Sequence, residues 1–518
     1  MEYLVTAEEM KRYDAATIEK IGIPSLVLME RAALSVYEEI LAVKEPDKKQ
    51  RVLIMAGCGN NGADGLALAR MLSSGFGVEV VILGNQEKAT AEWKKQYEIL
   101  QHFPVRTGRK PEAMEYDILV DAIFGVGLSR DVSGEYAEMI EWFNQAEGWK
   151  IAVDVPSGIH SDTGRLMGCG VKADLTVCFA FGKRGLFFYP GCEYAGKVVI
   201  KDIGIEENAF GEKAPGMFRY TEGIRGLLPA RENSGNKGTF GKVLLAAGTR
   251  EMAGAAVLSA KSCYRAGAGM VKVLTPECNR VILQTAVPEA LLATLLPEVI
   301  SISEAAPISK SAPFPETGWE ERKQFLQWPN VLAIGPGLGT DERAYKILHT
   351  FLEESRLPMV IDADGLNLLS QHEELMEQVR EQGTAGREMI LTPHAGELAR
   401  LCGITIEKVK ESPVEVASGL AQSLNCVIVS KDARTLVCKS GEPVCMNTVG
   451  NNGMAVAGSG DVLTGIIAGL MAQGMDAWKA AAVGVYLHGL AGDAAAARLG
   501  QYGMTASDLA DAVAEVTK

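Results

Sequence analysis

The chain has 518 residues, of which 47% are hydrophobic and 22% are charged. This composition is ordinary for a folded globular protein and excludes the disordered and fibrous classes. The length predicts roughly two to four domains. The formal net charge of −14 argues against a general nucleic-acid binder, because nonspecific affinity for phosphate backbones comes from clustered lysine and arginine.

The N-terminal segment 1–6 lacks a basic region followed by an apolar core, and no charge-free stretch reaches the length of a membrane span. We therefore expect no membrane association and a cytoplasmic location. The 10 cysteines are scattered without CxxC pairs. Cys178, Cys426 and Cys438 lie in apolar runs, which predicts buried free thiols rather than disulfides or zinc ligands.

Helix and strand patterns alternate through the first part of the chain. Thr6-Ala7-Glu8-Glu9 has the form of a capping box and predicts a helix that runs towards Lys20. A second helix is expected over 25–43. Further strands are expected at 51–56, 79–83, 117–124, 150–155, 174–181 and 197–200, with helices at 64–74, 90–102 and 135–145. Buried strands separated by helices predict an α/β fold, a Rossmann-like three-layer sandwich with a mainly parallel sheet.

The strand pattern stops after Ile205, where a charged segment containing Gly211 and Pro215 follows. We therefore place a domain boundary near residue 211 and predict two domains, 1–211 and 212–518. A second alternating series predicts another α/β domain, with strands at 241–248, 270–274, 331–334, 359–362, 388–391 and 426–430. Its segment 308–318, rich in proline and serine, is expected to be a surface excursion.

Polar residues and glycines follow three strands of the first domain, in the segments Asn60–Gly65, Asp121–Arg130 and Asp154–Gly158. Ligands of open α/β sheets bind beyond the carboxyl ends of the strands, so these segments should converge. Asn61, Asp121 and Ser157 offer hard oxygen ligands, which suit an alkali or alkaline-earth cation better than zinc. Asp154 is a candidate for acid/base catalysis. Taken singly, however, each glycine could form only a turn, and each aspartate could cap the next element.

The motifs NNGADG, DAIFGVGLSR and DVPSG together resemble the N-terminal domain of NAD(P)H-hydrate epimerases, over residues 1–211. The resemblance implies that Asn61, Asp121 and Ser157 hold potassium and that Asp154 acts at the reacting ring. It also implies that two loops bind the phosphates and ribose of the hydrated dinucleotide. The implied binding residues are Asn60, Asn61, Gly62, Ala63, Asp64, Gly125, Val126, Gly127, Leu128, Ser129, Arg130, Asp131 and Asp154.

In the second domain, the segment Gly450–Asp461 joins a glycine-rich loop to a carboxylate and precedes an apolar run. Glycines expose backbone N–H groups, and the run predicts a helix whose positive N-terminus would face the same anion. Asp461 could then deprotonate a hydroxyl beside a bound phosphate. The simpler interpretation is a turn in which Asp461 merely caps the helix.

Further polar segments follow other predicted strands of this domain: 236–241, 335–339, 362–367, 391–397 and 431–435. Gly335, Gly337 and Gly339 would permit close approach of a ligand to the backbone. His394 lies at a strand end beside Thr392 and Glu397, a position that favours a binding role, although a lone histidine is more often structural.

Together these segments resemble the ADP-dependent NAD(P)H-hydrate dehydratases of the ribokinase-like group, over about residues 220–518. By that resemblance, the adenine nucleotide contacts Lys431, Asp432, Ala433, Arg434, Thr435 and Gly460. The hydrated nicotinamide contacts Ala253, Gly337, His394 and Asp461. ADP is the implied co-substrate, and magnesium is expected to accompany it.

Both resemblances imply a metabolite-repair enzyme for NADHX and NADPHX, the forms of NADH and NADPH hydrated at C6. The first domain would exchange the R and S epimers, with Asp154 as the acid/base. The second would dehydrate the S form, with Asp461 as the base, while ADP yields AMP and phosphate. We also expect a homo-oligomer.

Two alternatives have different consequences. A ribokinase-like kinase for a small alcohol would use the same anion-binding loop and base, and would accumulate a phosphorylated product. The first domain could instead be a non-catalytic binding module, a reading that Asp121, Asp154 and Ser157 argue against, as does the acidic balance.

Overall fold

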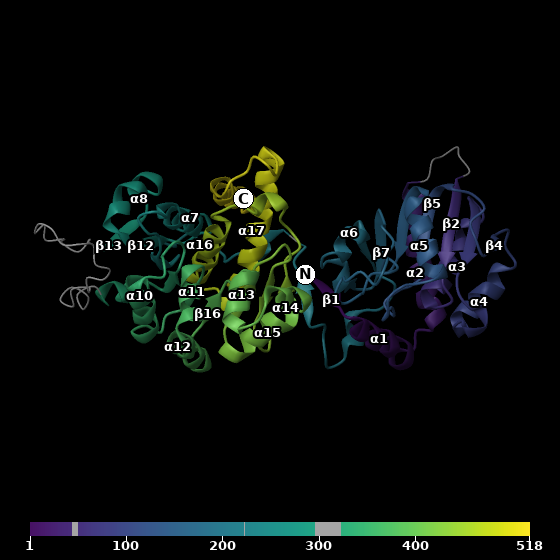
Figure 1. The fold of residues 1–518 in the computed structure, drawn as a ribbon, viewed down its shortest axis with the longest axis horizontal. Helices are drawn as coiled ribbons and strands as arrows, with labels where there is room; N and C mark the ends of the chain where they lie inside the picture. Colours follow the sequence, from purple (N-terminus) through teal and green to yellow (C-terminus); the bar gives the residue numbers. More distant parts are fainter. Residues whose placement is uncertain (44–49, 222, 296–322) are drawn as a thin grey trace, which may run out of the picture. The chain divides into compact units, whose positions relative to one another are not determined.

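The computed structural model describes residues 1–43, 50–221, 223–295 and 323–518. The chain divides into two compact units, Met1–Phe218 and Arg219–Lys518 (Figure 1). The boundary predicted near residue 211 falls in the loop between η4 (Glu207–Phe210) and β10 (Met217–Arg219). The proline- and serine-rich segment 308–318 lies outside the described residues.

The first unit is built on a parallel sheet with the strand order β4-β3-β2-β5-β6-β7-β9. Its strands are β2 (Arg51–Ala56), β3 (Gly77–Ile82), β4 (Arg106–Gly108), β5 (Glu115–Ala122), β6 (Glu147–Val153), β7 (Leu175–Phe179) and β9 (Lys197–Lys201). In addition, β1 (Glu2–Val5) pairs in parallel with β8 (Gly182–Lys183). The predicted parallel sheet is confirmed. The short strands β1, β4 and β8 were not predicted.

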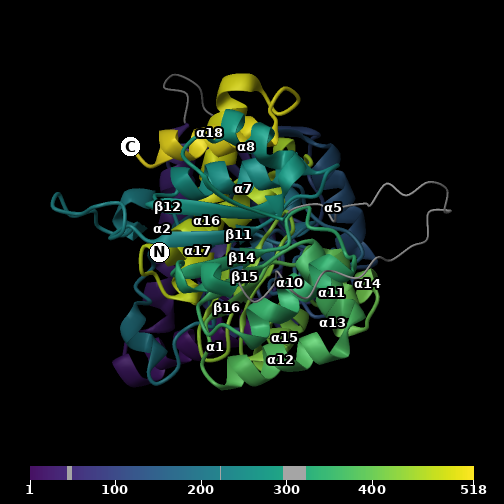
Figure 2. The same cartoon turned by 90° about the vertical axis from the view of Figure 1, so that its left-hand side faces the viewer.

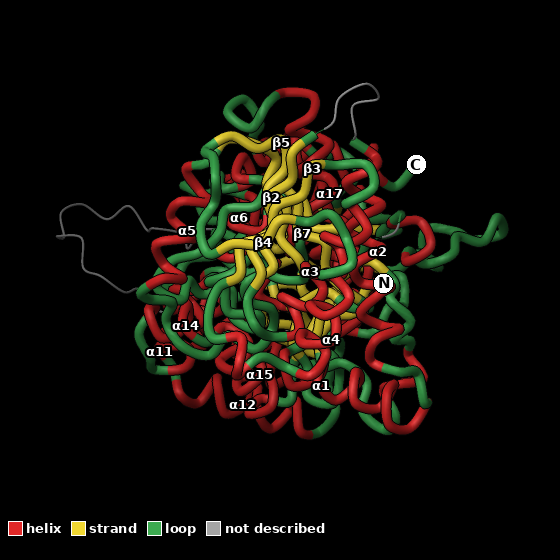
Figure 3. Tube along the Cα trace, turned by 90° about the vertical axis from the view of Figure 1, so that its right-hand side faces the viewer, coloured by secondary structure: helices red, strands yellow, loops and turns green. Residues whose placement is uncertain are grey.

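Helices cover both faces of this sheet. They are α1 (Ala7–Ala15), the π-helix η1 (Ala16–Ile21), α2 (Ser25–Ala42), α3 (Asn60–Leu72), α4 (Ala91–Leu100), α5 (Glu135–Gln145) and α6 (Gly191–Ala195), with 3₁₀ turns η2 (Gln86–Lys88) and η3 (Arg184–Leu186). Figure 3 shows α5 on one side of the strands and α2, α3 and α4 on the other. The side chains of β2 alternate accordingly: Val52 and Ile54 join one core with α3, whereas Leu53 and Met55 join the other with α5.

The helix predicted from the N-terminal capping box is present. Thr6 is the N-cap of α1, its hydroxyl accepts a hydrogen bond from the backbone N–H of Glu9, and the Glu9 carboxylate accepts one from the Thr6 N–H. The chain stays helical to Ile21 through the wider turns of η1, which end at Gly22 with φ of +92°. The helix predicted to run towards Lys20 is therefore confirmed, with a change of helix type along it.

The second unit has the strand order β13-β12-β11-β14-β15-β16-β17-β18-β19. Its strands are β11 (Lys242–Ala246), β12 (Met270–Pro276), β13 (Leu291–Leu295), β14 (Val331–Ile334), β15 (Met359–Ile361), β16 (Met389–Leu391), β17 (Val427–Ser430), β18 (Leu436–Cys438) and β19 (Val444–Met446). The pairs from β13 to β17 are parallel, as predicted, whereas β18 and β19 add antiparallel pairs at β17. That antiparallel extension was not predicted from its short strands.

Helices pack on both sides of this second sheet as well. They are α7 (Ala253–Arg265), α8 (Arg280–Ala286), α10 (Glu342–Glu353), α11 (Asp364–Gln371), α12 (Glu373–Thr384), α13 (Ala395–Cys402), α14 (Ile406–Glu411), α15 (Pro413–Leu424), α16 (Ser459–Ala472), α17 (Ala477–Leu499) and α18 (Ala506–Val516), with 3₁₀ turns η5 (Ile224–Leu227), η6 (Glu277–Asn279), η8 (Lys323–Gln327) and η9 (Asn452–Met454). Figure 2 shows the green helices α11 to α15 on one side of the strands and α7 on the other. The buried helix α16 packs on α7 and contacts β11, β14 and β15.

Two further sequence predictions concern the core and membranes. Cys178, Cys426 and Cys438 are free and buried, as predicted. Among the helices that the structure describes, none combines the length and the apolar character needed to cross a membrane.

Candidate active sites

Asp154 follows β6 and adopts φ of +65°, a value that few residues other than glycine take. Its Oδ1 accepts hydrogen bonds from Lys183 Nζ at 2.5 Å and from the backbone N–H of Phe179 at 3.1 Å. Lys183 is only 1% exposed and also donates to the Phe179 carbonyl at 2.7 Å. Within the described part of the chain both donors meet Oδ1, so Oδ2 is the oxygen available to a ligand.

The electrostatics of this ion pair favour the charged form of the lysine. Burial alone would lower the pKa of Lys183, but the charge and hydrogen bond of Asp154 outweigh it and raise that pKa. Lys183 was not predicted as a functional residue. The only sequence signal is that Gly182-Lys183 directly follows a buried strand, which does not show which carboxylate the lysine meets.

Asp64 lies in α3 just after its first turn, and the charge of Asp154 acts on it. Burial, and then the charges of Asp154 and Asp14, raise the pKa of Asp64 well above its usual range. The Asp64 carboxyl is therefore close enough to Asp154 for the two charges to interact.

The three predicted cation ligands converge around Phe124. Asn61 Nδ2 donates to the Phe124 carbonyl at 3.0 Å, and the Phe124 N–H donates to Ser157 Oγ at 2.9 Å. Ser157 Oγ in turn donates to Asp121 Oδ1 at 2.6 Å. Asp121 is fully buried, and its burial raises its pKa to about 6 in spite of these hydrogen bonds. Amide, hydroxyl, carboxylate and carbonyl oxygens clustered in this way fit a hard cation such as potassium.

The two predicted dinucleotide loops are placed differently. Gly125 approaches the first loop, since a Cβ there would lie 3.3 Å from Asn61 Oδ1. Gly127 has open space around it, and Ser129, Arg130 and Asp131 are exposed.

The first loop contains residues with structural tasks. A Cβ at Gly62 would lie 1.8 Å from the Gly57 carbonyl oxygen, so this glycine is required for the close packing of α3 on its own loop. Ala63 is fully buried, and its N–H donates to the Gly59 carbonyl at 3.0 Å. Neither its side chain nor its N–H is therefore free for a ligand in this structure.

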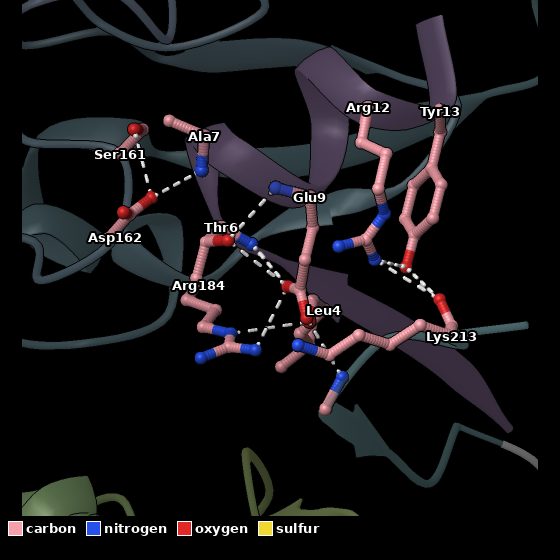
Figure 4. A network of polar contacts seen from close by, with 11 residues as sticks. Leu4, Thr6, Ala7, Glu9, Arg12, Tyr13, Ser161, Asp162, Arg184 and Lys213 are labelled. Carbon is pink, nitrogen blue, oxygen red and sulfur yellow. Dashed lines mark hydrogen bonds and ion pairs between the residues drawn. The ribbon is translucent and has the colours of Figure 1, made fainter. Parts of the chain in front are cut away.

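The N-terminal segment supports the Lys183 side of the site. Val5 of β1 pairs with Lys183, and the neighbouring Arg184 donates from Nη2 to Glu9 Oε2 at 3.0 Å. Figure 4 shows Arg184 and Glu9 pointing towards each other, next to the Thr6 capping box. The strand and helix at the start of the chain thus hold the segment that carries the lysine.

In the second unit, Gly458 starts α16 with φ of +93°, and no side chain caps this helix. A Cβ at Gly458 would lie 2.5 Å from Leu258 Cδ1, so the loop packs closely on α7. Asp461 is not the N-cap that the simpler interpretation required; it lies within the first turn, and its carbonyl accepts a hydrogen bond from Ser259 Oγ at 3.0 Å. No side chain competes for the N-terminus of α16, so the anion site that the sequence predicts there stays a prediction compatible with this geometry.

The carboxyl group of Asp461 is half-buried beside other charges. Burial first, and then the charge of Asp362, raise the pKa of Asp461 to about 7, while Lys431 opposes the shift. A carboxylate with a pKa near neutrality is well matched to the work of a general base.

Asp362 and Lys431 form a buried ion pair at the ends of β15 and β17. Lys431 Nζ donates to Asp362 Oδ1 at 2.7 Å, and Thr464 of α16 donates to Asp362 Oδ2 at 2.6 Å. A Cβ at Gly460 would lie 3.3 Å from Lys431 Nζ, so the ammonium group lies directly beside the anion-binding loop. Asp362 and Thr464 were not among the predicted site residues.

Two of the predicted substrate contacts lie together at the start of α7. Ala253 is the first residue of that helix, and a Cβ at Gly337 would lie 3.0 Å from Met252 Cβ and 2.9 Å from Ala255 Cβ. Gly337 has φ of +57°, so glycine is needed there for conformation as well as for space.

His394 is a structural cap whose ring also lies close to the ion pair. Its Nδ1 accepts hydrogen bonds from the Gly396 and Glu397 N–H groups at the start of α13. Burial, then the charge of Lys431, lowers its pKa, and an isolated bridge pairs His394 with Lys431. The remaining predicted nucleotide contacts, Asp432, Ala433, Arg434 and Thr435, form the turn that follows Lys431.

Comparisons with known proteins agree with this division. A family model described as NAD(P)H-hydrate dehydratase matches residues 243–515, and one described as YjeF-related protein N-terminus matches residues 25–185. A solved structure similar to this chain is the ADP/ATP-dependent NAD(P)H-hydrate dehydratase of Bacillus subtilis, co-crystallized with ATP and Mg²⁺. It is 27% identical, with a TM-score of 0.45, and the match covers 57% of this chain and 94% of that chain.

Relatives match along nearly the full length. The bifunctional NAD(P)H-hydrate repair enzyme of Moorella thermoacetica is 39% identical over 98% of this chain and 95% of its own length. The enzyme of the same name from Coxiella burnetii is 34% identical over 98% of both chains. The resemblance carried by the motifs is thereby confirmed, and the chain belongs to the family of bifunctional NAD(P)H-hydrate repair enzymes.

Proposed function

We propose that Asp154 and Asp461 are the catalytic residues of the two reactions of this bifunctional NAD(P)H-hydrate repair enzyme. The first unit epimerises the R and S forms of NAD(P)H hydrated at C6. The second unit dehydrates the S form back to NAD(P)H and converts ADP to AMP and phosphate. Because hydration creates a stereocentre, the first reaction makes both epimers available to the second.

In the first unit, the lone pair of the ring nitrogen expels the C6 hydroxyl as Asp154 Oδ2 delivers a proton to it. Water then adds to either face of the resulting iminium and returns a proton to the same oxygen. Lys183 and the Phe179 N–H hold Oδ1, which orients Oδ2. The buried carboxyl of Asp64, whose pKa is raised well above its usual range, lies near this pair.

In the second unit, Asp461 removes the proton of the C6 hydroxyl while the hydroxyl oxygen attacks the terminal phosphorus of ADP. AMP then leaves. The lone pair of the ring nitrogen then expels phosphate with cleavage of the C6–O bond. Loss of a proton from C5 to water restores the C5=C6 double bond of the ring. The N–H groups of Gly458 and Gly460 at the start of α16 and the ammonium of Lys431 stabilise the phosphate charge. The observation that carries this assignment is the half-buried Asp461, with its pKa of about 7, at the uncapped start of α16.

Two ions complete the proposal. Asn61, Asp121 and Ser157 would hold potassium, which supplies positive charge beside the bound dinucleotide. Magnesium would arrive with the nucleotide, because phosphate oxygens and water are the ligands that it prefers. Self-association and a cytoplasmic location stay predictions from the sequence.

The decisive experiment uses a matched pair of variants, D154N and D461A, with an epimer mixture of hydrated NADH, ADP and magnesium. Wild-type protein should convert both epimers with stoichiometric AMP. D154N should stop after the S form is consumed, and D461A should exchange epimers without forming AMP while still binding ADP. Full conversion by D154N would remove Asp154 from its role, and normal AMP formation by D461A would remove Asp461.

A further inference from the structure

The turn Asp362–Ala363–Asp364 lies between the two loops that the proposed dehydration uses. Ala363 adopts φ of +46° and ψ of −115°, a conformation that residues with a Cβ rarely take. Such strain persists only where the surroundings over-determine the backbone, and it gathers at functional sites. The contacts of the two flanking aspartates show what imposes it.

Asp362 connects this turn to the nucleotide side of the site. Its side chain is 1% exposed and accepts hydrogen bonds from Lys431 Nζ and from Thr464 Oγ1. Thr464 lies one turn into α16, the helix whose N-terminus forms the anion site. A Cβ at Gly460 would lie 3.8 Å from Asp362 Oδ2. Asp362 therefore holds both α16 and the Lys431 ammonium group, which flank the proposed position of the terminal phosphate.

Asp364 connects the same turn to the substrate side. Its Oδ2 accepts a hydrogen bond from the Gly339 N–H at 2.8 Å, and its Oδ1 accepts one from Asn367 Nδ2 at 3.3 Å. The backbones of the two segments are also in close contact, because a Cβ at Gly335 would lie 1.7 Å from the Asp362 carbonyl oxygen. The loop that carries Gly337 is thus packed directly on this turn.

We propose that the Asp362–Ala363–Asp364 turn is a positioning element that holds the nucleotide loop and the hydrated-nicotinamide loop at a fixed separation. Asp362 acts through Lys431 and Thr464, and Asp364 acts through Gly339. Neither aspartate is a catalytic residue, since each works through another group. The inference rests on the proposed function of the second unit and adds residues that set its geometry.

The arrangement predicts that the KM for the S hydrate and the KM for ADP respond to different substitutions. D364A removes the acceptor for the Gly339 N–H and should raise the KM for the S hydrate about tenfold, while the KM for ADP stays near the wild-type value. D364N keeps an acceptor oxygen and loses only the charge, so it should restore most of the loss. If Asp364 acted only through its negative charge in the first turn of α11, D364N and D364A would have equal effects.

D362N and T464V test the other side. Both should raise the KM for ADP about tenfold and leave the KM for the hydrate near wild type. Asp362, Asp364 and Lys431 are the charged groups that act on Asp461. Of D362N and T464V, only D362N removes a negative charge, so of these two only D362N should move the acidic limb of kcat to lower pH. T464V keeps the ion pair and decides the question if D362N fails to fold.

Two outcomes would overturn the inference. One is a KM change for the hydrate in T464V or for ADP in D364A, because the two arms would then not be separate. The other is that all four variants keep the wild-type KM values for the hydrate and for ADP. Either result leaves the dehydratase assignment standing, because that assignment depends on the loss of AMP formation in D461A.

Discussion

The two units use the same device, a lysine paired with a buried aspartate at the end of a parallel strand, for different purposes. In the first unit the paired carboxylate is the catalytic candidate itself, Asp154, which Lys183 meets at 2.5 Å. In the second unit the paired carboxylate is Asp362, at 2.7 Å from Lys431, and the catalytic candidate Asp461 stands outside the pair. Strained backbone accompanies each pair, at Asp154 and at Ala363.

The difference gives the lysine a different task in each unit. A carboxylate bonded directly to an ammonium group is oriented by it, which suits a group that must relay a proton repeatedly. A carboxylate beside an already paired aspartate feels an additional negative charge. Burial and that charge raise the pKa of Asp461 to about 7, which suits a base that accepts a proton near neutrality. In the first unit the ion pair therefore orients Asp154, whereas in the second unit the aspartate of the pair helps to raise the pKa of Asp461.

Removing each lysine gives the sharpest contrast. K183M should slow epimer exchange about a hundredfold, because Asp154 loses the group that orients it, and should leave dehydration of the S form unchanged. K431M should instead raise the KM for ADP and lower the rate of AMP formation. Separate assays of the two reactions measure both effects. K172M, at an exposed lysine of the first unit, is the matched control, and loss of both activities in K183M would contradict the comparison.

The pH dependence of dehydration should report Asp461. As a base it works in the ionised form, so kcat should rise with pH through about 7 and level off above it. At one pH unit below that pKa, the rate should be about tenfold lower than the plateau. Initial rates with saturating S hydrate and ADP check this between acidic and alkaline buffers. A plateau that extends unchanged to pH 5 would rule out the raised pKa.

Potassium removal should affect only the first unit. Exchange of potassium for a bulky organic cation should slow epimerisation several-fold without changing dehydration of the S form. S157A removes the hydroxyl that meets Asp121 at 2.6 Å, so it should abolish the response to potassium. If dehydration responds to the ion and epimerisation does not, the cation belongs elsewhere.

The smallest expected effect concerns the support of the Lys183 segment. T6A removes the side-chain half of the capping box and should lower the free energy of unfolding of the first unit by about 1 kcal/mol. Urea titration followed by circular dichroism measures it. T505A, in the capping box of α18, is the equivalent change in the second unit. An equal effect of both variants on epimerase activity would show that Thr6 has no special link to the site.

Much of the fold was predictable from local pattern. The strand 51–56 and the helix 135–145 were predicted with their observed bounds, because long buried runs and amphipathic repeats carry strong periodic signals. The three-residue strands β4, β18 and β19 were not predicted, whereas the equally short β15 and β16 were. The loops around Asp154 and Asp461 were also identified in sequence, because glycines and acids at strand ends have a recognisable composition.

The sequence by itself determined which loops carry the chemistry, since glycine, aspartate and serine at the ends of buried strands are legible in the chain. Only the tertiary structure decided which charges meet. Lys183 reaches Asp154 across 29 residues, Lys431 reaches Asp362 across 69, and Thr464 reaches it across 102. These contacts depend on strand order and helix packing, and a pattern of hydrophobic and polar residues does not specify which strand ends become neighbours.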